Sequence, residues 1–176
     1  MTDIFLTGNT DDNEIEMLIK SRLSKTYTLN YIKENRFYET GSGYNLIIFE
    51  NENPIISTVS GVLMMKEYGN IPEDVPKNIT AIVNSDNEEQ IKAVQKKHIP
   101  VITCGTCNKS TISFTSETDE KLMISLNRSV TALSGKIIEP LEIPVEKGGA
   151  KRYSLMSYTA LRLLLDDFNS DLGKLI

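Results

Sequence analysis

The segment ITAIVNSDNEEQIKAVQKKHIPVITC, residues 79–104, decides the fold class. It opens with an apolar run that favours a buried strand and then enters a polar turn. Asp86 followed by Glu89 is typical of a capping box, so the sequence predicts a helix over Glu88–His98. Pro100–Cys104 is apolar enough for a second strand. Two strands joined by one helix predict a parallel β-α-β unit with a right-handed crossover.

Segments on both sides extend this unit. Tyr44–Glu50 is apolar at consecutive positions, which favours a strand covered on both faces. Residues 55–68 are ambiguous, because ISTV favours a strand and VLMMKEY favours a helix. The alternating segments 110–117 and 121–127 predict an antiparallel hairpin. We expect one α/β domain over residues 1–176, with three layers around a mostly parallel, Rossmann-like sheet and an antiparallel hairpin extension. Short strands are also expected at Ile4–Leu6 and Thr28–Ile32.

Two more helices are predicted from apolar residues at helical spacing. The first covers residues 11–23 and is expected to begin with a capping box of Asp11 and Glu14. The second is expected to begin at Ser154. The residues predicted to face inward are Ile15, Leu18, Ile19, Leu23, Leu161, Leu164, Leu165 and Phe168.

Composition excludes some classes of function. The formal net charge is -5, and the basic residues are scattered rather than clustered. A surface that binds DNA or RNA needs clustered Lys and Arg, so we expect no nucleic-acid partner. The first residues lack the pattern of a signal peptide, and no apolar run approaches the roughly 20 residues that span a bilayer. We therefore expect a cytoplasmic protein that does not contact a membrane.

The first helix follows a turn of unusual composition. In FLTGNTDDNEIEMLIKSRL, residues 5–23, an apolar strand meets Gly8 and then a helix, which is the layout of a phosphate-binding loop. Such a loop needs a lysine for the phosphates and a Ser or Thr for magnesium. Here the turn carries Asp11 and Asp12, whose carboxylates would repel a triphosphate.

Three stretches give the chain a resemblance to a known family. FLTGNTDDNEIEMLIKSRL is similar to a strand, TGTNGKTT and a helix in the central domain of the Mur ligases, the ATP-dependent amino-acid ligases of peptidoglycan synthesis. AIVNSDNEEQIKAV followed by PVITCG resembles the family's VVNADDP…L helix and VITFG strand. The hairpin, IEPLEIPV and SLMSYTALRLLLD resemble the end of the same domain. The family's first and third domains are absent from this chain, so the resemblance implies that no complete ligase site forms within it.

The resemblance implies a phosphate-binding loop that has lost its function. Aligning Thr7-Gly8 with the family's TG places Asp12 where the lysine belongs and Asn13 where the Ser or Thr belongs. Glu50 falls near the family's acidic metal-binding residue, although a solvent-exposed glutamate at a strand end is the alternative. A plain strand-turn-helix capped by acids is the alternative for the loop, and it predicts the same lack of ATP binding.

Cys104 and Cys107 form a CxxC pair. A redox-active pair needs a helix N-terminus, which lowers the thiol pKa, but here a strand is expected to follow. A zinc site would need Cys104 and Cys107 with His98 and a carboxylate such as Asp86. The alternative is Cys104 as a small buried apolar residue and Cys107 in a turn.

These patterns predict a non-catalytic binding module without a cofactor. Ligands of open α/β sheets bind beyond the carboxyl ends of the strands. We expect the site there, built from Gly8, Asn9, Thr10, Asp12, Glu50, Asn84 and Asp86. Their amides and carboxylates suit a cation, an amine or a hydroxylated ligand better than a phosphate. The partner is a small ligand, another protein or a further copy of the chain.

Two other functions stay open on the sequence. The first is a nucleotide-dependent enzyme of cell-wall precursor metabolism, with Asn9 and Thr10 on the phosphate and Glu50 on magnesium. It would need a lysine from another chain. The second is a redox or metal-binding protein that uses Cys104 and Cys107.

Overall fold

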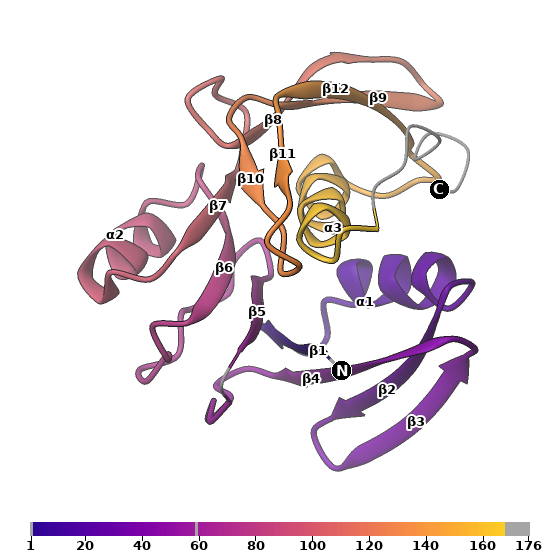
Figure 1. Cartoon of the computed structure of the whole chain (residues 1–176), viewed down its shortest axis with the longest axis vertical. Coiled ribbons are helices and arrows are strands. Elements are labelled where there is room, and N and C mark those ends of the chain that lie inside the picture. Colours follow the sequence, from indigo (N-terminus) through magenta and orange to yellow (C-terminus); the bar gives the residue numbers. More distant parts are fainter. Residues whose placement is uncertain (1, 59, 168–176) are drawn as a thin grey trace.

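The β-strands form one mixed sheet with helices on both of its faces (Figure 1). The computed structural model describes residues 2–58 and 60–167. Within these residues the sheet has ten strands in the order β12-β9-β8-β7-β6-β5-β1-β4-β2-β3, and β10 and β11 form a separate ribbon. The strands are β1 (Thr2–Thr7), β2 (Tyr27–Lys33), β3 (Arg36–Gly41), β4 (Tyr44–Asn51), β5 (Gly61–Met65), β6 (Ile79–Asn84), β7 (Val101–Cys104), β8 (Ile112–Glu117), β9 (Lys121–Leu126), β10 (Val130–Thr131), β11 (Ile137–Ile138) and β12 (Leu141–Glu146). The helices are α1 (Glu14–Leu18), which continues as a π-helical segment (Ile19–Leu23), α2 (Glu88–Lys97) and α3 (Arg152–Leu164).

The direction of the strands confirms the predicted fold class. The seven neighbours from β2 to β8 in the sheet pair in parallel. At one end β8, β9 and β12 pair antiparallel, and at the other end β3 pairs antiparallel with β2. The hairpin β8–β9 is the predicted antiparallel extension. In contrast, the hairpin strand β3 was not predicted, because its two-residue turn at Glu34 lacks the glycine that usually marks such turns; Glu34 itself adopts a φ of 53°.

The predicted β-α-β unit is present as β6, α2 and β7, with both strands parallel. The predicted cap of its helix is wrong. Asn87, not Asp86, is the N-cap residue of α2, and its side chain accepts hydrogen bonds from the backbone N–H groups of Glu89 and Gln90. The carboxylate of Asp86 instead accepts bonds from the backbone N–H and the hydroxyl of Thr106, beyond the end of β7. A partner distant in sequence therefore takes Asp86 away from the helix.

The helices cover the sheet unevenly. α1 and α3 pack on one face, and α2 packs on the other (Figure 1). α3 is buried around its whole circumference, because the sheet, α1 and the β10–β11 ribbon surround it. Leu161 and Leu164 face inward as predicted, whereas Phe168 lies outside the described residues. Ser154 does not cap this helix: the N-cap residue is Lys151, and Ser154 lies inside the helix and donates a hydrogen bond to Glu14.

The first helix is shorter than predicted. It begins at Glu14, after Asn13, with no side-chain cap, so the predicted capping box of Asp11 and Glu14 is wrong. Its predicted apolar stripe is nevertheless buried against α3 and the sheet, as expected for Ile15, Leu18, Ile19 and Leu23. The helix forms without this cap because burial of its apolar side chains stabilises a helix more than capping of its ends does.

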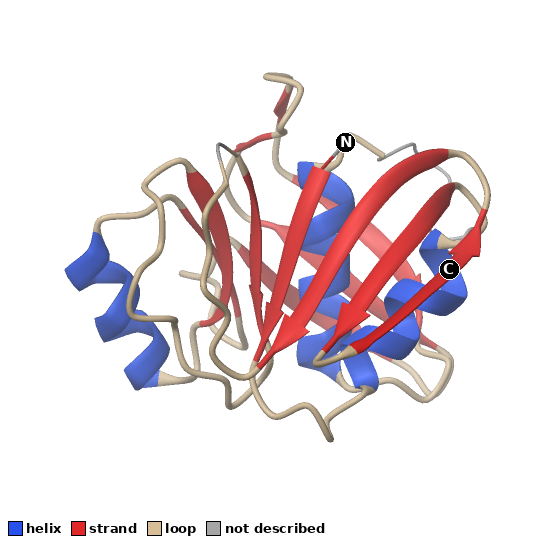
Figure 2. Ribbon diagram, turned by 90° about the horizontal axis from the view of Figure 1, so that it is seen from below, coloured by secondary structure: helices blue, strands red, loops and turns tan. Residues whose placement is uncertain are grey.

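Two questions about the strands could be decided only by the tertiary structure: whether the segment 55–68 contains a strand, and whether β4 is covered on both faces. The ambiguous segment contains β5, whose five residues are all buried at the centre of the sheet. β4 was expected to be covered on both faces, and this is wrong. Leu46 and Ile48 are buried under α1, but Ile47 and Phe49 on the opposite face are only partly buried. Figure 2 looks onto that face, where strands near the N-terminus lie in front with no helix over them.

In residues 2–58 and 60–167, none of the helices combines the length and the hydropathy that a membrane-spanning helix requires.

Candidate functional site at the carboxyl edge of the sheet

The predicted site residues fall into two groups at the carboxyl edge of the parallel strands. Gly8, Asn9, Thr10 and Asp12 follow β1, and Glu50 lies near the end of its neighbour β4. The second group, Asn84 and Asp86, lies at the end of β6. Between the two groups is β5, which pairs with β1 on one side and β6 on the other. The residues that follow β5 therefore decide what this edge can bind.

Lys66, the first residue after β5, fills the turn that resembles a phosphate-binding loop. Its side chain is 2% exposed, and its Nζ lies 2.7 Å from the backbone oxygen of Asn9 and 2.7 Å from Oε1 of Glu50. Gly8 has a φ of +130°, and a Cβ at this position would lie 2.8 Å from Cβ of Lys66. The turn needs glycine because the lysine stem crosses directly over it. A lysine that is distant in sequence and directly follows β5 therefore lies at this turn.

Glu50 is the carboxylate at the centre of this arrangement. The alternative of a solvent-exposed glutamate is wrong, because the Glu50 side chain is 0% exposed. Its Oε2 accepts a hydrogen bond from the Tyr31 hydroxyl, and its Oε1 lies 3.0 Å from the Nζ of Lys33 as well as beside Lys66. Burial raises the pKa of the Tyr31 hydroxyl, and the neighbouring Glu50 charge raises it further, so Tyr31 stays a hydrogen-bond donor.

A second carboxylate, Glu16 of α1, continues the chain of charges. Lys33 Nζ lies 2.7 Å from its Oε2, and Lys20 and the Tyr38 hydroxyl both bond to its Oε1. Burial would raise the pKa of Glu16, but the hydrogen bonds from these three side chains outweigh burial and lower the pKa to about 2. We call Lys20, Glu16, Lys33, Glu50 and Lys66, with Tyr31 and Tyr38, the lysine–glutamate cluster.

Aromatic rings pack against each other and against a lysine within the lysine–glutamate cluster. The rings of Tyr31 and Tyr38 stack with centroids 5.0 Å apart, and the Lys20 ammonium lies 3.8 Å from the Tyr38 centroid. Three ammonium groups face two carboxylates, so one positive charge is left over. Lys20 is the most exposed of the three lysines, with 32% of its side chain accessible, and water can solvate the excess charge there.

The remaining loop residues bond to one another. The backbone N–H of Glu14 donates to Asp12, and the backbone N–H of Asp11 donates to the side chain of Asn9. The Thr10 hydroxyl donates to Glu34 on the β2–β3 turn at 3.2 Å. The Asp12 carboxylate therefore occupies the start of α1, where a phosphate-binding loop would present its N–H groups to an anion.

On the other side of β5, Gln90 organises the end of β6. Its side chain is buried, and its amide donates to the backbone oxygens of Lys66 and Gly69 at 3.0 and 2.9 Å. Its carbonyl accepts the backbone N–H of Asn84 at 2.8 Å. The side chain of Asn84 accepts the backbone N–H of Asp86, which shapes the turn before α2. The two predicted residues on this side thus have structural bonds already.

A polar cleft of about 600 Å³ opens beyond these turns, between the ends of β6 and β7, the β8–β9 hairpin and the start of α3. Both signs of charge line it. Lys147 and Arg152 hold Glu117 at 2.6 and 2.5 Å, while Asp86 and Glu67 lie on the strand-end side. The lining also includes Asn84, Thr106, Asp119, Lys151 and Tyr153.

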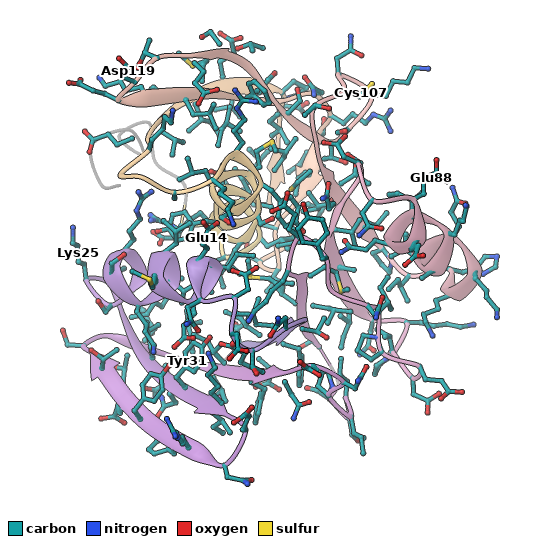
Figure 3. The ribbon with its side chains drawn as sticks, turned by 180° about the vertical axis from the view of Figure 1, so that it is seen from behind. Glu14, Lys25, Tyr31, Glu88, Cys107 and Asp119 are labelled. Atoms are coloured by element: carbon teal, nitrogen blue, oxygen red, sulfur yellow. The ribbon has the colours of Figure 1, made fainter. Side chains whose placement is uncertain are left out.

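The CxxC pair is not arranged for redox chemistry. Cys104 is fully buried and burial raises its thiol pKa, whereas Cys107 is exposed in the loop before β8 (Figure 3). No helix follows the pair within the described loop, so no helix dipole favours a thiolate. His98 ends α2 in the left-handed conformation and contacts the backbone oxygen of Lys96. Across residues 2–58 and 60–167, no three His, Cys, Asp or Glu side chains gather as metal ligands.

Comparisons with known proteins identify the fold. No family model matches the chain, and no curated protein matches it. Among solved structures, a UDP-N-acetylmuramoyl-L-alanyl-D-glutamate–2,6-diaminopimelate ligase matches with a TM-score of 0.56 and 12% sequence identity. The match covers 100% of this chain and 46% of that one, so the chain spans about half of the ligase's length. The resemblance to the Mur ligases is thus confirmed for the fold, and an identity of this size shows the fold alone.

Sequence reasoning missed Lys66, and it missed Lys33 and Tyr31, which are the other partners of Glu50. One signal could have found Lys66. If the apolar run GVLMM is taken as a buried strand, Lys66 is the first residue after its carboxyl end, where α/β sheets place their functional groups. Lys33 and Tyr31 carried no such signal, because their contact with Glu50 depends on the pairing of β2 with β4.

Proposed function

We propose that this chain is a non-catalytic binding module with a Mur-ligase-like fold, and that its glycine turn does not bind a nucleotide. The observation that carries the proposal is the position of the Lys66 ammonium between Asn9 and Glu50. A nucleotide site at this turn would need room for phosphate and an accessible carboxylate for the metal. Lys66 fills the space that the phosphate would need, and its ammonium neutralises the Glu50 carboxylate that would bind the metal.

The existing contacts of Glu50 conflict with magnesium binding at this turn. Mg²⁺ prefers carboxylate oxygens together with several waters. Both oxygens of Glu50 already accept bonds from protein groups, and the side chain has no contact with solvent. Removing these partners would leave buried charges unpaired, which costs several kcal/mol. The ammonium groups of Lys66 and Lys33 therefore occupy the place beside Glu50 that a metal cation would need.

The cleft beside α3 supports the binding part of the proposal. Its volume of about 600 Å³ is typical of sites for small ligands, and two of the predicted residues, Asn84 and Asp86, line it. Asp86, Glu67 and Asp119 on its wall suit a ligand that carries an amine or hydroxyl groups. Lys147 and Arg152 are engaged by Glu117, so an anionic ligand would have to displace that carboxylate.

Thermal unfolding with and without millimolar Mg-ATP or Mg-GTP tests the nucleotide part. A ligand at about a hundred times its dissociation constant adds roughly 2.7 kcal/mol, which is an easily measured shift in Tm. We expect no shift. A clear shift with either nucleotide contradicts the proposal.

One observation favours a second candidate, a nucleotide-dependent enzyme. The lysine that such an enzyme would need from another chain is present in this one, because Lys66 reaches the glycine turn. If Lys66 exchanged Glu50 for a phosphate, Mg-ATP would raise the Tm of the wild type but not that of Lys66→Met. The same experiment therefore separates the two candidates.

The cleft is tested with amines as probes. Glucosamine, lysine and spermidine at millimolar concentration are titrated by calorimetry against the wild type, Glu67→Gln and the control Glu88→Gln, which lies on the exposed side of α2. We expect at least one probe to bind the wild type and Glu88→Gln, and to bind Glu67→Gln more weakly. Equal binding to all three proteins would remove the cleft from the proposal.

A further inference from the structure

The face of the sheet opposite α1 and α3 has a helix over only half of its width. α2 and the loops around it cover β5, β6 and β7 on this face. Within residues 2–58 and 60–167, no helix packs on β4, β2 and β3 from this side, and Figure 2 shows these strands open to the viewer. In a three-layer fold this is the position of a helix that the described chain does not provide.

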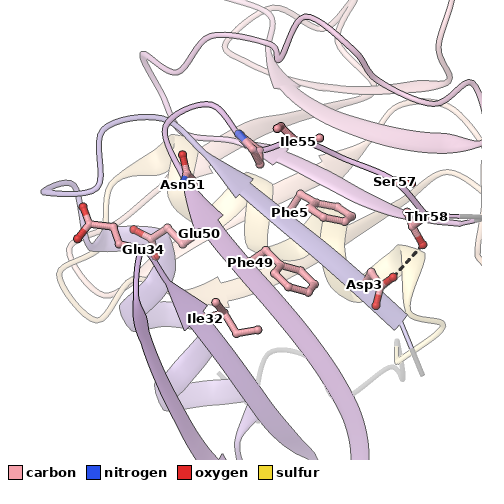
Figure 4. A pocket seen from close by; sticks show the side chains of 11 residues that line it. Asp3, Phe5, Ile32, Glu34, Phe49, Glu50, Asn51, Ile55, Ser57 and Thr58 are labelled. Atoms are coloured by element: carbon pink, nitrogen blue, oxygen red, sulfur yellow. Dashed lines mark hydrogen bonds between the residues drawn. The ribbon is translucent and has the colours of Figure 1, made fainter.

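An apolar row crosses this open half. The strand register places Phe37, Ile32 and Phe49 side by side on β3, β2 and β4, and the row ends at Phe5 of β1, which is buried in the cluster that α2 covers. Phe5 and Phe49 stack with centroids 5.3 Å apart, and Figure 4 shows both rings with Ile32 on this face. Phe37 is 64% exposed, and Ile55, on the loop after β4, is 95% exposed. A cavity of about 350 Å³ lies among Phe5, Phe49, Ile32 and Ile55.

Acidic side chains flank the row on both sides. The neighbouring cross-strand row holds Asp3 and Glu39, which pair in register with Ile47 and Asn30, and Glu34 lies at the other side by the turn. Among the described residues of β1, β2, β3 and β4 that point to this face, none is Lys or Arg. The basic residues of these strands, Lys33 and Arg36, pair in register on the opposite face.

We propose that this half-sheet is the docking surface for an amphipathic helix of a partner protein, with an apolar stripe flanked by Lys and Arg. The apolar stripe would lie on Phe37, Ile32 and Phe49, beside the exposed Ile55, and the basic flanks would face Asp3, Glu39 and Glu34. Three strands at a spacing of about 4.8 Å give a surface roughly 10–15 Å wide, which suits about two or three helical turns.

Charge decides between this partner and a second copy of the chain. The chain carries a net charge of -5, so two copies that meet through this acidic face would repel each other. A basic helix would be attracted instead, and its association rate would fall as salt screens the attraction. The surface is separate from the strand-end cleft, so this proposal stands whether or not the cleft binds a ligand.

The test uses a fluorescent leucine–lysine peptide with an amphipathic helical pattern, measured by anisotropy against the full chain. The peptide controls have the same composition in scrambled order, or glutamate in place of lysine. Phe37→Ser combined with Ile55→Ser removes two exposed anchors without touching the core. Tyr44→Ser is the matched control, because Tyr44 is 84% exposed but points to the other face of β4.

We expect the leucine–lysine peptide to bind the wild type and Tyr44→Ser equally, and the double variant at least about tenfold more weakly. Glu34→Lys with Glu39→Lys should weaken this peptide and favour the leucine–glutamate peptide. Hydrogen exchange should show protection of residues 28–49 on binding. Equal binding to all variants, or equal binding of all three peptides, overturns the proposal. So does a wild-type dimer in sedimentation that Phe37→Ser and Ile55→Ser dissociate, since a second copy would then cover the face.

Discussion

Replacing Lys66 by Met should strongly destabilise the protein. Met keeps the apolar stem that crosses Gly8 but removes the ammonium, so Glu50 loses a partner at 2.7 Å while its side chain stays 0% exposed. Removing one partner of a buried ion pair costs about 3–5 kcal/mol. Lys33 remains 3.0 Å from the same Glu50 oxygen, so we expect the lower end, about 3 kcal/mol.

Urea denaturation measures this loss directly. With a slope of about 1–3 kcal/mol per molar urea, typical of small proteins, a loss of about 3 kcal/mol should lower the midpoint by roughly 1–3 M. Lys92→Met is the matched control, because Lys92 bonds to Glu88 at 3.0 Å with both side chains largely exposed. Water and salt screen such an exposed pair, so the control midpoint should scarcely move.

A double-mutant cycle separates the charge from the packing. Combining Lys66→Met with Glu50→Gln removes both charges, and the remaining amide can still accept the Tyr31 hydrogen bond. We expect the double variant to be more stable than the sum of the single losses implies, with a coupling of about 2 kcal/mol. The reasoning fails if Lys66→Met unfolds at the wild-type midpoint, or if the two changes are simply additive.

Three further predictions concern neighbouring residues. Because the folded-state pKa of Glu16 is lowered from 4.5 to about 2, its ionised form stabilises the fold above pH 5 and this contribution is lost as the pH falls toward 2; we expect about 1–3 kcal/mol, measured as an acid limb in urea midpoints that Glu16→Gln removes. Gln90→Leu leaves the backbone N–H of Asn84 without its acceptor and should cost about 1–3 kcal/mol in the same assay, whereas an unchanged midpoint would show that water replaces the amide. Gly8→Ala places a Cβ 2.8 Å from the Lys66 stem at a φ of +130° and should lose more than about 2 kcal/mol, while Gly149→Ala, with φ +81° and open space around it, should lose only about 1 kcal/mol; equal losses would mean that the lysine stem does not confine the turn.

Local patterns were sufficient for much of the fold. The unit β6-α2-β7 and the hairpin β8–β9 follow from periodicity within about 25 residues, and both are present. Errors appeared where a local pattern had a distant competitor. Asp86 and Glu89 have the spacing of a capping box, yet Asp86 bonds to Thr106, which is 20 residues away. Ser154 fits a cap equally well, but it meets Glu14 from the other end of the chain.

The sequence by itself determined the α/β class. It also predicted that Gly8, Glu50, Asn84 and Asp86 lie at the carboxyl edge, where the structure places them in two groups on either side of β5, and that the acidic turn disfavours a phosphate. Only the tertiary structure decided what occupies that turn. Lys66 is 57 residues from Asn9 and 16 from Glu50, and it reaches both because β5 lies beside β1 in the sheet. No local periodicity encodes which strands become neighbours. That order is fixed by burial of the whole sheet between its helices, and with it the partner of every charge at its edge.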